Sequence, residues 1–172
     1  MSIQEESVHQ DSVKKLAKLI HGIEIAMLTT EDQDGCLHSR PMATQKKDFD
    51  GSLWFFCRED SAKAGEISAH KRVNLSYASP AYDRYVSVAG TAEVVKDRAK
   101  IAEFWNPHYT AWFPEGEKDP QLVLIRVNVE SAQYWDLPHN PVIHLKGFLN
   151  AVKSGHSYRP KDSSESEKIK IA

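Results

Sequence analysis

Arg40 and Lys63 are two basic residues that lie on either side of an Asp50-Gly51 turn signal, and each adjoins a strand-like run of residues. A guanidinium on a strand can form bidentate hydrogen bonds with phosphate oxygens. Ser61 resembles the N-cap of a short helix, so Lys63 would lie in a first turn where free backbone N–H groups attract anions. Together with the aromatic strand that precedes Ser61, these residues could hold a planar, phosphorylated cofactor.

The same residues also have ordinary structural interpretations, which the sequence leaves open. Most strand arginines are solvated, and Ser61 with Lys63 could be no more than a helix cap followed by a surface lysine. Pro41 cannot donate to a sheet ladder, so it belongs at an edge, a strand end or a bulge. An edge position would leave the backbone of Met42 and Thr44 open to a ligand ring.

The bulk properties indicate a single soluble domain. A chain of 172 residues, 41% hydrophobic and 27% charged, is ordinary for one globular unit with a sizeable core. Its formal net charge of −2 gives no electrostatic reason to expect nucleic acid or an acidic membrane as a partner. No apolar run approaches the roughly 20 residues that span a bilayer, and the acidic N-terminal segment lacks the features of a signal peptide. We therefore expect a cytoplasmic protein.

Other reactive patterns are absent from the sequence. Cys36 and Cys57 have no Cys-x-x-Cys spacing, so we expect free thiols rather than a disulfide. His139 and His144 are five residues apart, which is wrong for one helical face, and we expect no metal site. No Gly-x-Gly-x-x-Gly motif, P-loop or Gly-x-Ser-x-Gly motif supports a nicotinamide Rossmann site or a hydrolase.

Hydrophobic spacing predicts six or seven antiparallel strands with a few short helices, which favours a small, mainly β barrel over a sandwich. The strands are expected at residues 23–30, 36–45, 53–57, 73–78, 85–95, 122–129 and 132–135, and the helices at 13–20, from 61, at 97–104 and at 142–152. Two Asp-Gly turns predict that the first three strands pair consecutively. A long loop over residues 106–120 is of the kind that is usually functional or disordered. We expect one domain over residues 1–155 and a polar tail over 156–172, which could end in an edge strand.

Three short segments carry a resemblance to a known family. Arg40-Pro41-Met42, the strand ending in Phe56-Cys57 and the following Ser61-Ala62-Lys63 resemble the FMN-binding strand and phosphate loop of the pyridoxamine 5′-phosphate oxidase-like superfamily. The general stress protein branch is more similar, because its pattern continues as in Tyr85-Val86-Ser87-Val88-Ala89-Gly90, Trp112-Phe113-Pro114-Glu115-Gly116 and Tyr134-Trp135-Asp136. The resemblance spans about residues 16–155 and rests on the order and spacing of these segments.

The resemblance implies a six- to seven-stranded antiparallel split β-barrel that forms a homodimer and binds FMN at the subunit interface. Carried over by position, the resemblance implies that Arg40, Ser61 and Lys63 hold the FMN phosphate. Met42, Thr44 and Gln45 would face the isoalloxazine ring, and Phe56 and Cys57 would line the ribityl and ring side. Tyr85 would lie beside the ring, and Trp112 and Trp135 would approach it from the partner subunit.

Departures from the family pattern limit the expected activity. In vitamin B6 oxidases the position of Gln45 would carry a substrate-binding lysine and that of Ala62 an arginine, and an Arg-x-His-type segment would end the chain. We therefore expect a flavin-dependent oxidoreductase that transfers hydride at flavin N5 and acts on an unknown small molecule, and not a pyridoxamine phosphate oxidase. Two alternatives stay open: a non-catalytic flavin carrier or sensor, and a split barrel that uses haem, with His38 as an axial candidate, or a deazaflavin.

Overall fold

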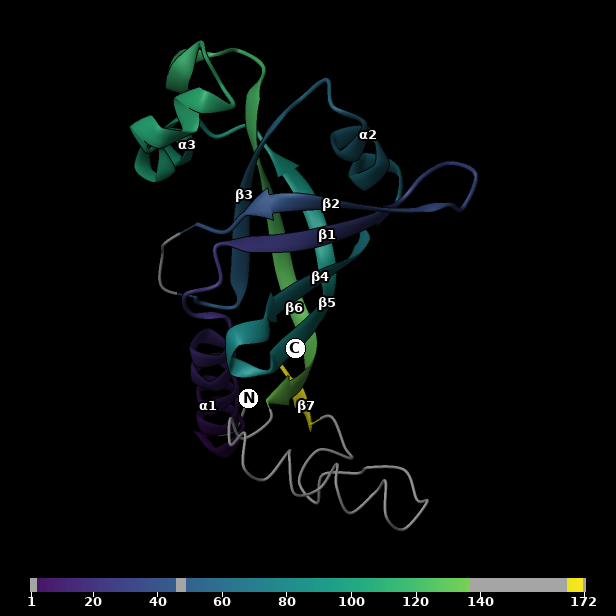
Figure 1. Cartoon of the computed structure of the whole chain (residues 1–172), viewed down its shortest axis with the longest axis vertical. Coiled ribbons are helices and arrows are strands. Elements are labelled where there is room, and N and C mark those ends of the chain that lie inside the picture. The colour runs from purple at the N-terminus through teal and green to yellow at the C-terminus, as the bar shows by residue number, and fades with distance from the viewer. Residues whose placement is uncertain (1–2, 46–48, 137–166, 172) are drawn as a thin grey trace.

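The computed structural model describes residues 3–45, 49–136 and 167–171, and this part of the chain is mostly β-sheet (Figure 1). Its helices are α1 (Ile3–Ile20), α2 (Ala62–Ala69) and α3 (Arg98–Phe104). Its strands are β1 (Ile25–Glu31), β2 (Leu37–Ala43), β3 (Ser52–Arg58), β4 (Arg72–Ser79), β5 (Arg84–Val95), β6 (Leu122–Asp136) and β7 (Glu167–Lys170). Short 3₁₀ turns are η1 (Pro80–Tyr82), η2 (Pro107–Ala111) and η3 (Gly116–Lys118).

The described strands form one antiparallel sheet in the order β2-β1-β4-β5-β6-β3, and β7 pairs with β6 beside this path. The sheet is strongly curled, so that β1 and β2 cross in front of the long β5 and β6 in Figure 1. The curl brings β2 and β3, the two ends of the strand order, close to each other without a ladder between them. This is the split β-barrel that the family resemblance implied, and it agrees with the small, mainly β barrel that the strand pattern predicted.

Two cores lie on opposite faces of the sheet. In β1, Ala26 and Leu28 point into the main core, while Ile25 and Met27 alternate with them on the exposed face. Leu16 of α1 is fully buried against the same core. A smaller core between α3 and the other face of β3 and β6 is formed by Phe56, Ile101, Phe104, Leu122 and Leu124. Strand β3 is therefore buried on both faces.

The predicted consecutive pairing of the first three strands is wrong for the third. β1 and β2 form the expected hairpin, but β3 pairs with β6, with Phe55 opposite Ile125. The Asp50-Gly51 signal marks the start of the β3–β6 ladder: Asp50 Oδ1 accepts a hydrogen bond from the Ser52 N–H, and Gly51 O accepts one from Val129. Strand β6 has α3 on one face and the main core on the other. Pairing with β6 therefore buries both faces of β3.

Further differences concern the limits of elements. Helix α1 begins at Ile3 rather than at residue 13, and the loop over 106–120 contains η2 and η3. The two strands expected at 122–129 and 132–135 are one strand, β6, which keeps pairing with β5 across a register shift next to Gly90. The helix expected at 142–152 falls outside the described residues. None of the described helices is long and apolar enough to cross a membrane.

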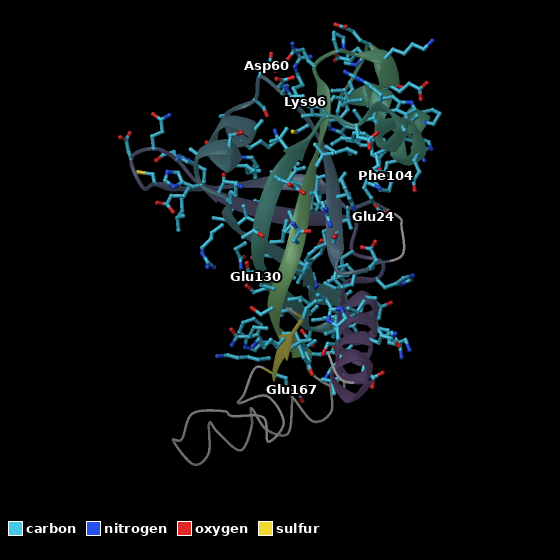
Figure 2. The ribbon with its side chains drawn as sticks, turned by 180° about the vertical axis from the view of Figure 1, so that it is seen from behind. Glu24, Asp60, Lys96, Phe104, Glu130 and Glu167 are labelled. Carbon is cyan, nitrogen blue, oxygen red and sulfur yellow. The ribbon has the colours of Figure 1, made fainter. Side chains whose placement is uncertain are left out.

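The late strand expected near Ile169 is present as β7, and it is attached to α1. Lys15 Nζ donates to Glu167 Oε2 at 2.8 Å, and His9 Nδ1 lies 2.6 Å from the backbone oxygen of Ile171. Figure 2 shows Glu167 at the end of the molecule where α1 lies. Ile169 and Ile171 are buried in the main core, so this part of the expected polar tail contributes to the domain.

Gly90 is a position where the sheet admits no side chain. A Cβ added there would collide with the backbone carbonyl oxygen of Asn128 on β6, at the register shift between the two strands. We expect Gly90→Ala to lower the free energy of unfolding by about 1–3 kcal/mol, because a rigid backbone group must move. Gly65→Ala in α2 is the control, since a Cβ at that position meets no atom within 4 Å. Urea unfolding of both variants checks this, and equal stabilities would contradict it.

Candidate functional site

A cleft of about 390 Å³ lies where the two ends of the sheet meet, beside α2 and η2. We call it the β2–β3 cleft, and its lining residues are Ile25, Pro41, Met42, Ala43, Gln45, Phe56, Cys57, Arg58, Ser61, Lys63, Tyr109, Trp112 and Phe113. β2 pairs with β1, with Pro41 opposite Met27, and no other described strand pairs with its second edge. The edge position expected for Pro41 is therefore confirmed.

One end of the β2–β3 cleft is cationic. Ser61 precedes α2 but does not cap it: its hydroxyl donates to the backbone oxygen of Arg58 at 2.6 Å and accepts no N–H of the first turn. Lys63 lies in that first turn and lines the cleft, and no carboxylate in the described part of the chain pairs with it. Uncapped N–H groups, the positive end of the helix dipole and an ammonium together favour an anion at this point.

Arg58 also lines the cleft, but its charge is already compensated. Its guanidinium donates to Asp60 Oδ1 at 3.0 Å and to Asp119 Oδ2 at 3.3 Å. The Asp119 carboxylate is buried, so this contact also pairs a charge that would otherwise be costly inside the protein. Sequence reasoning missed Arg58; its place at the end of the aromatic strand was the available signal.

Arg40 does not line the β2–β3 cleft. Its guanidinium donates to Thr30 Oγ1 at 2.5 Å and to Glu66 Oε2 at 2.9 Å, and Thr30 also donates to the same carboxylate. Burial raises the pKa of Glu66, but the hydrogen bonds from Thr30 and Arg40 outweigh it and hold the pKa below its ordinary value. Arg40 on β2 is thus connected to Glu66 on α2, which lies about one helical turn after Lys63.

The other wall of the cleft is aromatic. Phe56 packs against Tyr109 and Phe113, with ring centroids 5.1 and 6.2 Å apart, so the expected long loop supplies part of the site through η2. The Tyr109 hydroxyl donates to Gln45 Oε1 at 3.0 Å, while Gln45 Nε2 is buried with no partner. A buried N–H donor without an acceptor is costly in a dry protein, so this amide suits a ligand acceptor. Trp112 is largely exposed at the rim.

The cleft brings together seven of the residues singled out in the sequence: Met42, Gln45, Phe56, Cys57, Ser61, Lys63 and Trp112. Thr44 lines a different cavity, next to the end of α1 and the start of β3. Tyr85 and Trp135 are paired on the exposed face of β5 and β6 and do not line the cleft of their own subunit. The cleft adds Tyr109 and Phe113, for which the only signal was an aromatic-rich loop of unusual length.

His38, the residue considered for an axial haem ligand, lies on the β1–β2 hairpin and outside the cleft. Its Nε2 is 2.8 Å from Asp32 Oδ2, and this hydrogen bond is the main reason that the pKa of Asp32 lies below its ordinary value. Among the described residues, no group of three or more histidine, cysteine, aspartate or glutamate side chains is placed to hold a metal ion.

The two cysteines are free, and their environments differ. Cys36 is exposed on the hairpin, whereas Cys57 is 2% exposed in the cleft wall. Burial raises the pKa of Cys57 to about 11, against smaller opposing effects of the Lys63 charge and the Ser61 hydroxyl. Cys57 is therefore a protonated, apolar part of the wall at neutral pH.

We expect one fast and one slow thiol in the folded protein. With a disulfide reagent at pH 8, Cys57 should react at least about 100-fold more slowly than Cys36, because both burial and its raised pKa reduce the accessible thiolate. Absorbance of the released chromophore gives both rates, and Cys36→Ser should remove only the fast phase. Two thiols with equal rates in the folded protein would contradict this environment for Cys57.

Comparison with known proteins gives a consistent result. The family model described as "Pyridoxamine 5′-phosphate oxidase like" matches residues 11–159. Protein bli-3 of Neurospora crassa is 30% identical over 132 residues, which cover 71% of this chain and 63% of that protein, so the chain spans less than two thirds of its length. General stress protein 26 of Bacillus subtilis is 26% identical over 142 residues, covering 80% of this chain and 97% of that one.

A solved structure extends the similarity to three dimensions. The general stress FMN/FAD binding protein from Xanthomonas citri superposes with a TM-score of 0.65 at 29% identity, covering 76% of this chain and 92% of that one. The relatives thus match the general stress branch that the sequence indicated. With a family match over most of its length and a split-barrel fold, the chain belongs to the pyridoxamine 5′-phosphate oxidase-like family.

Proposed function

We propose that the protein is a flavin-binding oxidoreductase of the general stress type, which holds FMN in the β2–β3 cleft and acts on a small molecule. The observation that carries the proposal is the uncapped, cationic start of α2 at one end of an aromatic-walled cleft. The flavin-binding relative from Xanthomonas citri, 29% identical, supports the same choice of cofactor. The two free thiols, one of them exposed, suit a protein of the reducing cytoplasm.

The cleft residues fit the parts of FMN. Lys63 and the free N–H groups of α2 would bind the phosphate, and the Ser61 hydroxyl could join them by turning away from the Arg58 carbonyl oxygen. Phe56 and the edge of β2 around Met42 would enclose the ribityl chain and the ring, and the unpartnered Gln45 Nε2 would donate to a ring acceptor. When bound, the flavin supplies hydride transfer. The protein binds and orients it and excludes water from the cleft.

Arg40 is proposed to act through Glu66 rather than on the phosphate directly. Its two terminal nitrogens donate to Thr30 and Glu66, and the ion pair with Glu66 fixes α2 against β2. The first turn of α2, with Lys63, is thereby held at one end of the cleft. Arg40 is therefore a positioning residue, which acts on the phosphate site through Glu66 and α2.

A homodimer completes the proposed site. Ile25, Met27, Tyr85 and Trp135 are 50%, 39%, 42% and 39% exposed on the outer face of the sheet, where large apolar side chains are unusual. Tyr85 lies directly opposite Trp135 in the register, and Ile25 also lines the cleft. This apolar face is thus continuous with the cleft, and a second copy seated on it would cover the flavin with aromatic side chains.

Ile25→Glu should shift the protein from dimer to monomer and weaken FMN binding, because a charge would be buried in the proposed interface. Light scattering after size exclusion measures the mass, and Val8→Glu on α1 is the control, since Val8 is also an exposed apolar residue but lies away from the cleft. A monomeric wild-type protein, or a dimer unchanged by Ile25→Glu, would contradict the proposed assembly.

A specific feature of the cleft favours a second candidate, a non-catalytic flavin carrier or sensor. The described lining contains no histidine, aspartate or glutamate, and Cys57 is protonated, so it offers no general base near neutral pH. Stopped-flow reduction of the bound flavin by NADH or NADPH, followed by oxidation with a panel of small acceptors, distinguishes the two. Turnover faster than that of free FMN supports the oxidoreductase, and its absence supports the carrier.

A further inference from the structure

Arg58 is a second cation of the β2–β3 cleft, and it lies next to the proposed phosphate site. Its backbone oxygen accepts hydrogen bonds from the Ser61 N–H at 3.2 Å and from the Ser61 hydroxyl at 2.6 Å. Arg58, Ser61 and Lys63 all line the cleft. The Arg58 side chain is also exposed, so its guanidinium is open to an anion that enters from solvent.

The two edges of the Arg58 guanidinium have partners of different kinds. Nη1 donates to Asp119 Oδ2 at 3.3 Å, and the Asp119 side chain is only 2% exposed. That carboxylate also accepts the Gln121 N–H at 2.8 Å, which holds it in the turn before β6. Nε and Nη2 form a fork that donates to the Asp60 carboxylate at 3.0 and 3.2 Å, and Asp60 is 59% exposed. One edge is therefore anchored inside the protein, and the other is paired at the surface.

The surface pair of Arg58 and Asp60 can exchange at little cost. Ion pairs between exposed side chains contribute little to stability, and a released Asp60 carboxylate would be hydrated. A phosphate monoester carries about 1.5 to 2 negative charges at neutral pH, more than a carboxylate. Its oxygens also match the arginine fork in the same bidentate geometry. A phosphate at the start of α2 would therefore compete well with Asp60 for Nε and Nη2.

We propose that Arg58 is a ligand of the flavin phosphate, and that Asp60 occupies the guanidinium fork until the phosphate takes its place. Asp119 keeps its bond with Nη1 and holds the guanidinium at the cleft before and after the exchange. This inference rests on the proposed function and deepens it. Arg58 would add a second cation beside Lys63 and would make the cleft selective for phosphorylated flavins over riboflavin.

Inorganic phosphate tests the exchange without flavin. Flavin-free protein is titrated with phosphate, and separately with chloride at equal ionic strength, while ¹H–¹⁵N correlation spectra follow the Arg58 Nε–H and the Lys63 backbone N–H. Phosphate should shift both signals with one dissociation constant, and chloride should shift neither. A shift at Lys63 alone would overturn the role of Arg58 and leave the proposed anion site intact. No shift at either residue would contradict both.

Asp60→Asn should strengthen FMN binding by about two- to fivefold and leave riboflavin binding within about twofold, because an amide competes less well than a carboxylate for the Arg58 fork. Glu59→Gln is the matched control. It removes the same charge one residue away, but Glu59 pairs with Lys96 and not with Arg58. Asp60 and Lys96 are labelled at the same end of the molecule in Figure 2. An equal gain in Glu59→Gln would show a general charge effect and would overturn the exchange.

Arg58→Lys should weaken FMN binding by roughly 3- to 10-fold and leave riboflavin binding unchanged, because lysine keeps a charge near Asp119 but has no fork. In this background Asp60→Asn should add almost nothing, since the two residues form one interaction. Arg72→Lys is the control, because Arg72 is an exposed arginine that pairs with Glu130 and does not line the cleft. Undiminished FMN affinity in Arg58→Lys, or equal losses for both flavins, would contradict the proposal.

The experiments separate this inference from the proposed function. If Arg58→Lys fails to fold, the comparison of Asp60→Asn with Glu59→Gln still decides, because both carboxylates are at the surface and Asp119 keeps its partner. If the unaltered protein binds no FMN, the proposed function fails, while the phosphate titration still shows whether Arg58 leaves Asp60 for a phosphate.

Discussion

Lys63→Ala should weaken FMN binding by roughly 10- to 100-fold while leaving riboflavin binding almost unchanged. A charge-assisted hydrogen bond contributes about 1.5–3 kcal/mol, and in this cleft the Lys63 ammonium is the cation without a carboxylate partner among the described lining residues. Riboflavin carries the same ring and ribityl chain without the phosphate, so its affinity reports every contact except those with the phosphate. Quenching of flavin fluorescence on titration with protein gives both dissociation constants.

Lys71→Ala is the matched control for this experiment. Lys71 is an exposed lysine that lies just beyond the other end of α2, so its removal changes the net charge equally without touching the cleft. Its effect on FMN affinity should be less than about twofold at physiological ionic strength. Equal losses of FMN and riboflavin affinity in Lys63→Ala would show that Lys63 supports the fold of the cleft rather than the phosphate.

Glu66→Gln should destabilise the protein and weaken FMN and riboflavin binding to the same extent. The side chains of Arg40 and Glu66 are 22% and 13% exposed, so loss of the carboxylate leaves a largely desolvated guanidinium poorly paired. We expect a cost of about 1–3 kcal/mol in the free energy of unfolding. The Arg40→Met, Glu66→Gln double variant should cost less than the sum of the single changes, since the two residues form one interaction.

The alternative role of Arg40 predicts opposite results. If the guanidinium bound the phosphate directly, Glu66→Gln would release it and strengthen FMN binding, and Arg40→Met would weaken FMN but not riboflavin. Comparison of the two flavins in the two variants therefore separates positioning from direct binding. Urea unfolding of the same proteins gives the coupling free energy.

The ion pair also makes stability depend on pH. The pKa of Glu66 in the folded protein lies below its ordinary value of 4.5. The contribution of the ionised Glu66 carboxylate to stability is therefore fully present above about pH 4.5. It is lost as the pH falls through the lower pKa that Glu66 has in the folded protein. Glu66→Gln should flatten the dependence of unfolding free energy on pH in this acidic range.

Local patterns were sufficient to predict much of the fold. Hydrophobic patterns predicted β1, β4 and β5 to within a few residues, with clear alternation in β5, and the Ser61 signal predicted the start of α2. The pairing of β3 could not be predicted in this way. Its partner, β6, begins more than 60 residues later, and the choice depends on burial of Phe56 beneath α3, which is a tertiary contact.

The site shows the same division between local and tertiary information. Met42, Phe56, Ser61 and Lys63 lie in short segments whose order was informative, and the structure brings them to one cleft. The partner of Arg40 could not be predicted, because Glu66 reaches it only when α2 packs on the sheet. Tyr85 and Trp135 are expected at the flavin across a dimer interface, which stays a prediction.

The absorption spectrum of the purified protein after incubation with FMN and desalting, together with mass spectrometry of the released ligand, tests the central claim most directly. We expect a yellow protein with a flavin band and release of FMN at about one molecule per chain. A protein that emerges colourless, or that releases a haem or a deazaflavin in place of FMN, would contradict the assignment of the β2–β3 cleft as an FMN site.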